Sequence, residues 1–175
     1  MDWKKLQNGS DIRGVALEGI EGESVNLTNE VTTALAQAFV AWLGEKNGKT
    51  AQAIAVGSDS RISSPALCKA FADGAAAAGA TVLNFGMAST PAMFMVTVDE
   101  QLRADGAVMV TASHLPWNRN GLKFFTAKGG LEKADIARIL ELAPQFMGVE
   151  KKGNGEVKAV DFMATYCDIL VNYIR

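Results

Sequence analysis

The chain has 175 residues, a formal net charge of −2, 49% hydrophobic residues and 21% charged residues. A chain of this length can bury a core without disulfide or metal support, and the composition is typical of a globular protein and not of a disordered one. The near-neutral charge gives no support to nucleic-acid binding. We therefore expect the partner to be a small molecule or another protein.

The two cysteines, Cys68 and Cys167, lie in helical patterns and form no CxxC motif, which favours packing thiols in a reducing compartment. The first residues are too polar to begin a signal peptide, and no apolar run approaches the ~18 residues of a membrane span. We expect a cytoplasmic protein without membrane contact. A plastid or another organelle is the alternative, because a transit peptide that has been removed leaves no trace.

Strand-like and helix-like segments alternate along the chain. Cap residues mark several helix starts, such as Thr28 and the pairs Ser64-Pro65 and Thr90-Pro91. In chain order the sequence predicts a strand at 12–17, a helix from 29 to the glycines at 44 and 48, a strand at 53–56, a helix from 65 to near 79, a strand at 81–85, a helix from 91 through 98, strands at 107–110 and 122–125, and helices at 132–142 and 161–174. This order predicts an α/β fold: a three-layer α/β/α sandwich with a mixed, mostly parallel sheet.

A polar loop follows the expected core strand at 107–110. It reads Thr111-Ala-Ser-His-Leu-Pro-Trp-Asn-Arg-Asn-Gly-Leu-Lys123 and contains the only histidine of the chain. Open α/β sheets usually bind ligands at the carboxyl ends of their strands, so chemistry is expected in this loop. Ser113 is a candidate nucleophile or phosphate ligand. A simple turn residue is the alternative, because serine is favoured in turns for its local hydrogen bonds.

His114 and Lys123 are the other reactive side chains of this loop. His114 directly follows Ser113, so it is badly placed to be the base of a Ser-His-Asp triad, and no G-x-S-x-G motif is present. It suits anion binding or loop orientation, with loop packing as the alternative. Lys123 alternates with apolar neighbours, so it faces either water or the pocket of Ser113, where it would act as an acid or base.

Two further loops combine glycine, serine, aspartate and arginine. They read Gly9-Ser-Asp-Ile-Arg-Gly14 and Gly57-Ser-Asp-Ser-Arg61. The arginine fork matches phosphate oxygens, and glycine lets backbone amides approach an anion, although a surface Asp–Arg pair is the alternative for each loop. Together the three loops predict a phosphate pocket, with Arg13 as its first cation. No D-x-D-x-D motif for Mg²⁺ occurs, so a metal would need ligands from elsewhere or a phosphate on Ser113.

The three loops resemble motifs of the α-D-phosphohexomutases, the family of phosphoglucomutase and phosphomannomutase. The segment from Thr111 to Lys123 resembles the family's serine-loop pattern T-A-S-H-N-P followed by N-G-x-K, and the arginine loops resemble its G-T-x-x-x-R-G and G-x-D-x-R segments. The likeness runs from about residue 12 to 125, with the motifs in the family's order. Leu115 stands where asparagine is usual, and Ser58 where arginine is common.

The resemblance implies an enzyme that interconverts hexose 1-phosphate and hexose 6-phosphate through a phosphoserine and a bisphosphate intermediate. Ser113 would carry the phosphoryl group and contribute a phosphate oxygen to Mg²⁺. Arg13 would bind the phosphoserine, Lys123 would be the acid or base, and His114 would hold the sugar or the loop. A glucose 1,6-bisphosphate-type activator is implied as well.

Asn120 and Arg61 are also expected to bind substrate or phosphate. Because family members have four domains, we expect residues 1–148 to form the first, phosphoserine domain, and residues 149–175 a linker and the first helix of a truncated second domain. The remaining metal ligands would then lie in an absent second domain, and the chain alone would be inactive. Its partners would be a hexose phosphate and the remaining domains of the same enzyme.

A non-catalytic regulatory or interaction module with the same fold is the alternative function. The missing second domain favours it, whereas the joint presence of Ser113, Lys123 and Arg13 argues against it, because a binding module needs no such set. An unrelated Rossmann-like nucleotide binder has less support, since no G-x-G-x-x-G follows the first strand.

Overall fold

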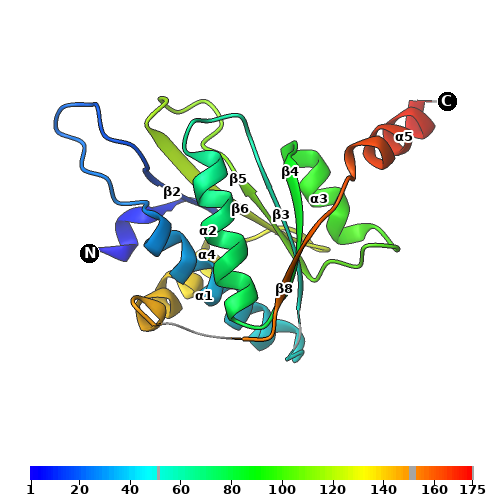
Figure 1. Ribbon diagram of the computed structural model, residues 1–175, viewed down its shortest axis with the longest axis horizontal. Helices are drawn as coiled ribbons and strands as arrows, with labels where there is room; N and C mark the ends of the chain where they lie inside the picture. The colour runs from blue at the N-terminus through cyan, green and yellow to red at the C-terminus, as the bar shows by residue number, and fades with distance from the viewer. Residues whose placement is uncertain (51, 150–152, 175) are drawn as a thin grey trace.

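A mixed sheet runs through the molecule and carries helices on both faces (Figure 1). The computed structural model describes residues 1–50, 52–149 and 153–174. Its strands are β1 (Gln7–Asn8), β2 (Asp11–Val15), β3 (Ala53–Ser58), β4 (Thr81–Met87), β5 (Gly106–Val110), β6 (Arg119–Thr126), β7 (Gly129–Gly130) and β8 (Glu156–Ala159). Its helices are α1 (Asn29–Asn47), α2 (Ser64–Ala77), α3 (Thr90–Val98), α4 (Lys133–Leu142) and α5 (Met163–Ile174), with short 3-10 helices at Trp3–Leu6 and Ala143–Phe146.

The strand order separates a parallel part of the sheet from an antiparallel part. The order is β1-β2-β6-β5-β3-β4-β8, with β7 added to β6. Strands β5, β3, β4 and β8 are parallel to one another, whereas β1, β2, β6 and β7 pair in the antiparallel sense. The predicted α/β class and mixed sheet with a largely parallel core are confirmed.

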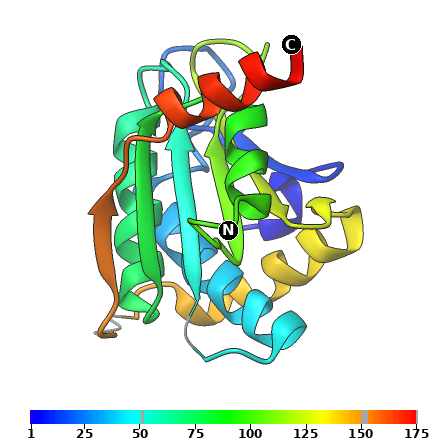
Figure 2. The same ribbon diagram turned by 90° about the vertical axis from the view of Figure 1, so that its right-hand side faces the viewer.

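The alternation of side chains along the strands divides the core into two layers. On β5, Val108 and Val110 pack with residues of α1, α2 and α4. Ala107 and Met109, on the other face of the same strand, pack with residues of α3 and with the segment that leads into α5. The resulting three layers of helix, sheet and helix can be followed in Figures 1 and 2.

Local signals set the helix boundaries. The Thr28 hydroxyl oxygen accepts a hydrogen bond of 3.2 Å from the Val31 amide, so Thr28 caps α1 as predicted. Gly48 ends α1 with a φ of +69°, a conformation that glycine adopts without steric cost. The caps of α2 and α3 are Ser63 and Ser89, one residue earlier than the sequence suggests.

The C-terminal segment contains a strand that the sequence does not predict. Glu156–Ala159 forms β8, which pairs in parallel with β4 at the edge of the sheet. All its residues are exposed, and a short charged edge strand has no alternating apolar pattern to reveal it. Phe162 lies edge-on to Phe85, with ring centroids 5.7 Å apart, so the start of α5 docks on this sheet. The linker residues 150–152 lie outside the described part of the chain.

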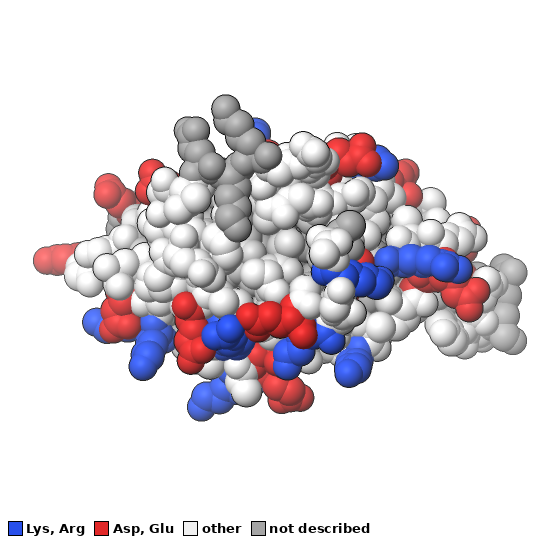
Figure 3. Space-filling model, turned by 90° about the horizontal axis from the view of Figure 1, so that it is seen from below, with Lys and Arg blue, Asp and Glu red and all other residues white. Residues whose placement is uncertain are grey.

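Charged side chains of both signs are interspersed on the face seen from below in Figure 3. The ion pairs of the described residues include Arg138 with Glu45 at 2.8 Å and Lys46 with Asp135 at 3.0 Å. Such exposed pairs contribute little to stability. None of the helices described is both long enough and apolar enough to cross a membrane.

Gly74 marks a close approach of α2 to α1. A Cβ at this position would lie 2.6 Å from the carbonyl oxygen of Thr33, which cannot move unless α1 shifts. Gly44, within α1, is a matched control, because its Cβ would lie 3.4 Å from the nearest neighbour.

We expect Gly74→Ala to lower the free energy of unfolding by about 1–3 kcal/mol, because the added methyl group overpacks the helix contact. Gly44→Ala should leave it unchanged or raise it by up to about 1 kcal/mol, because alanine favours the helix more than glycine. Urea denaturation followed by circular dichroism measures both changes. Equal stability of the two variants would contradict the close contact.

Candidate functional site

The candidate site lies where the chain changes direction across the sheet. From β3 the chain passes through α2 to β4 on one side, and from β4 through α3 to β5 on the other side of β3. The loops that follow β3 and β5 therefore leave neighbouring strands in different directions. The crevice between two such loops is the usual ligand position in an open α/β sheet. Both loops are among the three segments predicted to form a phosphate pocket.

Ser113, in the loop after β5, has an unusual backbone conformation. Its φ is +56°, in the left-handed region that residues with a Cβ seldom adopt. Its amide donates a hydrogen bond of 2.9 Å to the side-chain oxygen of Thr111. Its Oγ is 3.4 Å from Nδ1 of His114, and both residues are exposed. Backbone strain of this kind persists only where the surroundings impose it, and it is common at functional sites.

Arg61 holds this loop from the neighbouring loop after β3. Its Nη1 and Nη2 groups donate four hydrogen bonds of 2.7 to 3.1 Å to backbone carbonyl oxygens, which belong to Ser113, Leu115, Pro116 and Arg119. Its Nε lies 3.3 Å from the carboxylate of Asp59. Of the five N–H donors of arginine, the four on the terminal nitrogens thus have acceptors within the protein, and the fifth nitrogen is paired with a carboxylate. This arrangement favours a loop-holding role over the phosphate contact predicted for Arg61.

Asp59 links Arg61 to the start of the serine loop. Its Oδ2 accepts a hydrogen bond of 2.7 Å from the Thr111 hydroxyl. The Thr111 oxygen in turn accepts a hydrogen bond from the Ser113 amide. Its Oδ1 accepts hydrogen bonds from the Ser64 hydroxyl at 2.6 Å and from the Arg61 amide at 3.1 Å. Asp59 is thus the centre of a hydrogen-bond network that joins both loops and the start of α2.

Two cations share one carboxylate on the antiparallel strands β2 and β6. Arg13 Nη2 and Lys123 Nζ donate to the two oxygens of Asp11, at 2.9 and 2.8 Å. The other terminal nitrogen of Arg13, Nη1, is buried and has no hydrogen-bond partner within the described residues. Buried donors are normally paired. A cluster with one more positive than negative charge and an unpartnered donor is suited to bind an anion.

Gly121 brings Arg13 close to the serine loop. Arg13 and Gly121 are cross-strand partners on β2 and β6. A Cβ on Gly121 would lie 2.7 Å from Cδ of Arg13 and 3.0 Å from the carbonyl oxygen of Thr111. The Arg13 side chain therefore crosses β6 beside the residue from which the serine loop departs. The predicted loop at 9–14 is largely strand β2, and its Arg13 lies at the end of the sheet from which the serine loop departs.

Asn120 lies inside the protein. It is 0% exposed, and its Nδ2 donates to the hydroxyls of Ser63 and Ser64 at 2.8 and 3.0 Å. In this arrangement Asn120 exposes no atom that could make the predicted contact with substrate. Asn120 instead ties β6 to the start of α2.

Glu23, which belongs to none of the predicted motifs, also holds the end of the serine loop. Its carboxylate accepts a hydrogen bond of 2.7 Å from Asn118 and two hydrogen bonds from the Arg119 guanidinium. These bonds, first of all those from Arg119, hold the pKa of Glu23 below its usual range. The partners are more than 90 residues apart in the chain, so no local pattern reveals the contact.

Comparison with known proteins identifies the family. Residues 4–145 match the family described as phosphoglucomutase/phosphomannomutase, alpha/beta/alpha domain I, and the chain belongs to that family. It is 34% identical over 152 residues to a phosphomannomutase of Vibrio cholerae, which covers 85% of this chain and 32% of that protein. It is 38% identical over 130 residues to a phosphoglucosamine mutase of Synechococcus elongatus, which covers 73% of this chain and 27% of that protein.

Solved structures show the same fold. A phosphoglucomutase/phosphomannomutase family protein of Burkholderia thailandensis superposes with a TM-score of 0.78 at 25% identity, over 98% of this chain and 36% of that one. A putative phosphomannomutase of Thermus thermophilus gives a TM-score of 0.76 at 26% identity, over 95% and 35%. The resemblance predicted from the three loops is confirmed. The chain spans about a third of the length of these relatives, and the family match covers domain I alone.

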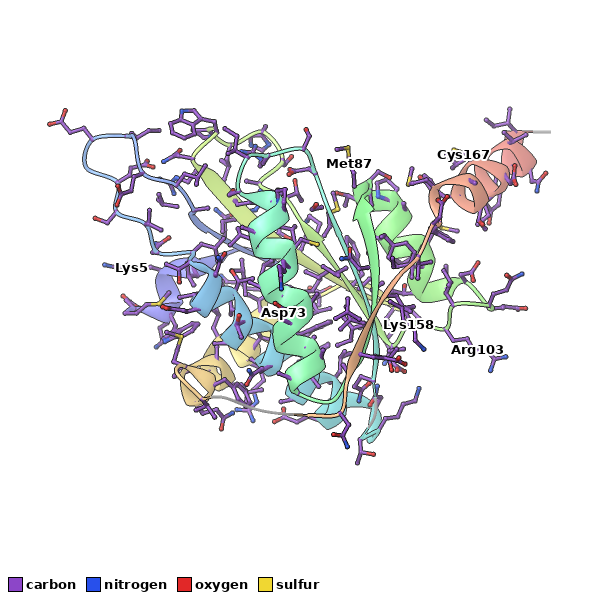
Figure 4. The ribbon with its side chains drawn as sticks, viewed as in Figure 1. Lys5, Asp73, Met87, Arg103, Lys158 and Cys167 are labelled. Atoms are coloured by element: carbon purple, nitrogen blue, oxygen red, sulfur yellow. The ribbon has the colours of Figure 1, made fainter. Side chains whose placement is uncertain are left out.

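A cavity of about 560 Å³ opens beside the loop after β3. Its walls include Arg61, Cys68 of α2, and the Asp73 and Met87 side chains labelled in Figure 4. Burial raises the pKa of the Cys68 thiol to about 11, against a partial lowering by a hydrogen bond with Ser58. Cys68 is therefore protonated at neutral pH, as a packing thiol should be.

We expect only Cys167, which lies exposed on α5 (Figure 4), to react with iodoacetamide in the folded protein at pH 8. The thiolate is the reactive form, and the raised pKa means that Cys68 becomes reactive only as the pH rises from about 9 toward about 11. Mass spectrometry of the alkylated protein, with a sample in denaturant as the control for two reactive thiols, measures this difference. Equal labelling of both cysteines at pH 8 would contradict the burial of Cys68.

Proposed function

We propose that this chain provides the phosphoserine domain of a phosphohexomutase, which interconverts hexose 1-phosphate and hexose 6-phosphate through a bisphosphate intermediate. The observation that carries the proposal is Ser113: it is exposed, strained and placed at the carboxyl end of β5, at the same end of the sheet as an anion-suited cluster. Family membership supports the reaction class, since relatives are named phosphomannomutase, phosphoglucomutase and phosphoglucosamine mutase.

In the proposed transfer, Ser113 Oγ attacks a phosphorus atom of the hexose bisphosphate. The new Oγ–P bond forms as the bond from phosphorus to the sugar oxygen breaks. The hydroxyl proton of Ser113 ends on that sugar oxygen, with Lys123 as the group that carries it. In the reverse transfer the free hydroxyl of a hexose monophosphate attacks the phosphorus on Ser113, and its proton returns to Oγ as the bisphosphate forms. Attack of Ser113 on the other phosphate of this bisphosphate then releases the product and restores the phosphoserine.

Phosphoryl transfer depends mainly on positioning and on neutralising negative charge. The unpartnered Nη1 of Arg13 is suited to bind oxygens of the transferred group, at a position where burial strengthens electrostatic interactions. His114, exposed and next to Ser113 Oγ, is suited to orient the sugar. Arg61, in contrast, supports the reaction through the loop that it holds.

The family typically uses Mg²⁺. Mg²⁺ demands octahedral coordination by oxygen, and no group of three or more His, Cys, Asp or Glu side chains within the described ranges could hold an ion. The residues described here therefore do not form the predicted metal site by themselves. An oxygen on Ser113 would supply one ligand, and the others would have to come from outside these residues.

We place the end of the phosphoserine domain near residue 148, with residues 149–175 leading toward a second domain. Strand β8 and the first turn of α5 nevertheless pack on the sheet of the first domain. Because the whole relatives are about three times as long as the matched region, we propose that turnover requires groups beyond those described here. We propose that the groups which select the hexose and bind a glucose 1,6-bisphosphate-type activator are among those further groups.

Phosphorylation of Ser113 is the direct test. The chain is incubated with Mg²⁺ and glucose 1,6-bisphosphate, with and without the separately expressed remainder of the Vibrio cholerae phosphomannomutase, and phosphate is mapped by mass spectrometry. We expect about one phosphate per chain on Ser113 in the complemented mixture, because the cationic cluster stabilises the transferred group. Ser113→Ala should carry none.

Ser24→Ala is the matched control, because Ser24 is an exposed loop serine with no role in the proposal. Lys123→Met should slow the labelling by about 100-fold or more if it carries the proton. Phosphate on another residue, or labelling that survives Ser113→Ala, would contradict the role of Ser113. No label in the complemented mixture would favour a non-catalytic module with this fold.

A further inference from the structure

We infer that Arg61, Asp59 and Thr111 are positioning residues that impose the left-handed conformation of Ser113 and so prepare its hydroxyl for phosphoryl transfer. The role in transfer rests on the proposed function, whereas the effect on the loop does not.

The Arg61 fork spans both halves of the serine loop. Nη2 binds the carbonyl oxygens of Ser113 and Leu115 at 2.8 and 2.7 Å, near the start of the loop. Nη1 binds those of Pro116 and Arg119 at 2.8 and 3.1 Å, near its end. The rigid, planar guanidinium group therefore holds both ends of the loop together. A lysine ammonium group could not replace it, because it has fewer N–H donors and they do not lie in one plane.

The second contact fixes the Ser113 amide. A threonine hydroxyl has a single proton, and Thr111 gives it to Asp59 at 2.7 Å. A lone pair of the Thr111 oxygen therefore remains for the Ser113 amide, at 2.9 Å. Asp59 thus sets the direction of the hydrogen bond that holds the strained residue, and Arg61 Nε, at 3.3 Å, keeps the Asp59 carboxylate in place.

The carbonyl and the amide of Ser113 are thus both held by the loop after β3, directly or through Thr111. This explains how a residue with a Cβ stays at a φ of +56° in an exposed loop. The competing interpretation is that Arg61 binds a substrate phosphate. Such a role would require it to release carbonyl oxygens that it binds here, and the two interpretations predict different measurements.

Amide hydrogen exchange of the 175-residue chain tests the effect on the loop. In Arg61→Lys the Ser113 and Leu115 amides should exchange at least about tenfold faster than in the unmodified chain, because the loop opens more often. Amides of the β3–β4 ladder should not change. Arg138→Lys is the matched control, because Arg138 makes exposed ion pairs with Glu45 and Glu141 and touches no residue of the loop.

Thr111 provides a second, gentler test in case Arg61→Lys perturbs folding. Thr111→Val keeps the shape of the side chain but removes the hydroxyl, so the Ser113 amide should exchange faster by a similar factor. Thr111→Ser restores the hydroxyl and should restore slow exchange. Unchanged exchange in both Arg61→Lys and Thr111→Val would overturn the inference.

The rate of Ser113 phosphorylation tests the role in transfer. In the complemented mixture, Arg61→Lys and Thr111→Val should slow labelling at saturating glucose 1,6-bisphosphate by about 100-fold, as expected for a misplaced nucleophile. The half-saturating concentration should change little, and Thr111→Ser should recover most of the rate. A raised half-saturating concentration with unchanged exchange would show that Arg61 is a phosphate ligand instead.

Failure of the proposed function is distinguishable from failure of this inference. If the unmodified chain is never labelled on Ser113, the phosphohexomutase proposal fails, and the exchange measurements still decide whether these residues hold the loop.

Discussion

The parallel pairing of β3 with β5 is the contact on which the candidate site depends. Ser58 and Val110 are partners in that ladder, and the Asp59 amide continues it by donating to the Val110 carbonyl at 3.1 Å. Two loops about 50 residues apart in sequence therefore leave the sheet side by side. This arrangement lets Arg61 reach the carbonyl oxygens around Ser113. The half-buried charges of Arg61 and Asp59 are tolerated because the two groups pair with each other.

Strand β6 supplies the site with three residues of different function within four positions. Asn120 turns inward and binds the hydroxyls at the start of α2. Gly121 leaves room for the Arg13 side chain, and Lys123 joins Asp11 on the same face of the sheet as Arg13. The alternation of a β-strand thus distributes structural and candidate catalytic tasks along one short segment. A shift of one residue in the β2–β6 register would exchange these faces and dismantle the cationic cluster.

Much of the fold could be predicted because its signals are local. The cap at Thr28 and the apolar strands needed no knowledge of distant residues. Strand β8 could not be predicted, because its exposed residues have no alternating apolar pattern. They form a strand because the free edge of β4 offers them backbone hydrogen-bond partners. The site follows the same division: the glycine-arginine and serine-histidine loops stand out in the chain, whereas the contacts of Glu23 with Asn118 and Arg119 appear only after folding.

The sequence alone determined the class of fold, the three polar segments that contribute residues to the candidate site, and the family to which the chain belongs. The tertiary structure decided which polar groups remain free to meet a ligand. Asn120 and Arg61 carry donors that suit a phosphate as well as a carbonyl or hydroxyl oxygen, and oxygens of the chain itself bind the Asn120 amide and both terminal nitrogens of Arg61. Arg13 keeps one donor unpartnered among the described residues. Hydrogen-bonding capacity is a property of the residue type, but its use depends on which acceptors the fold brings within about 3 Å.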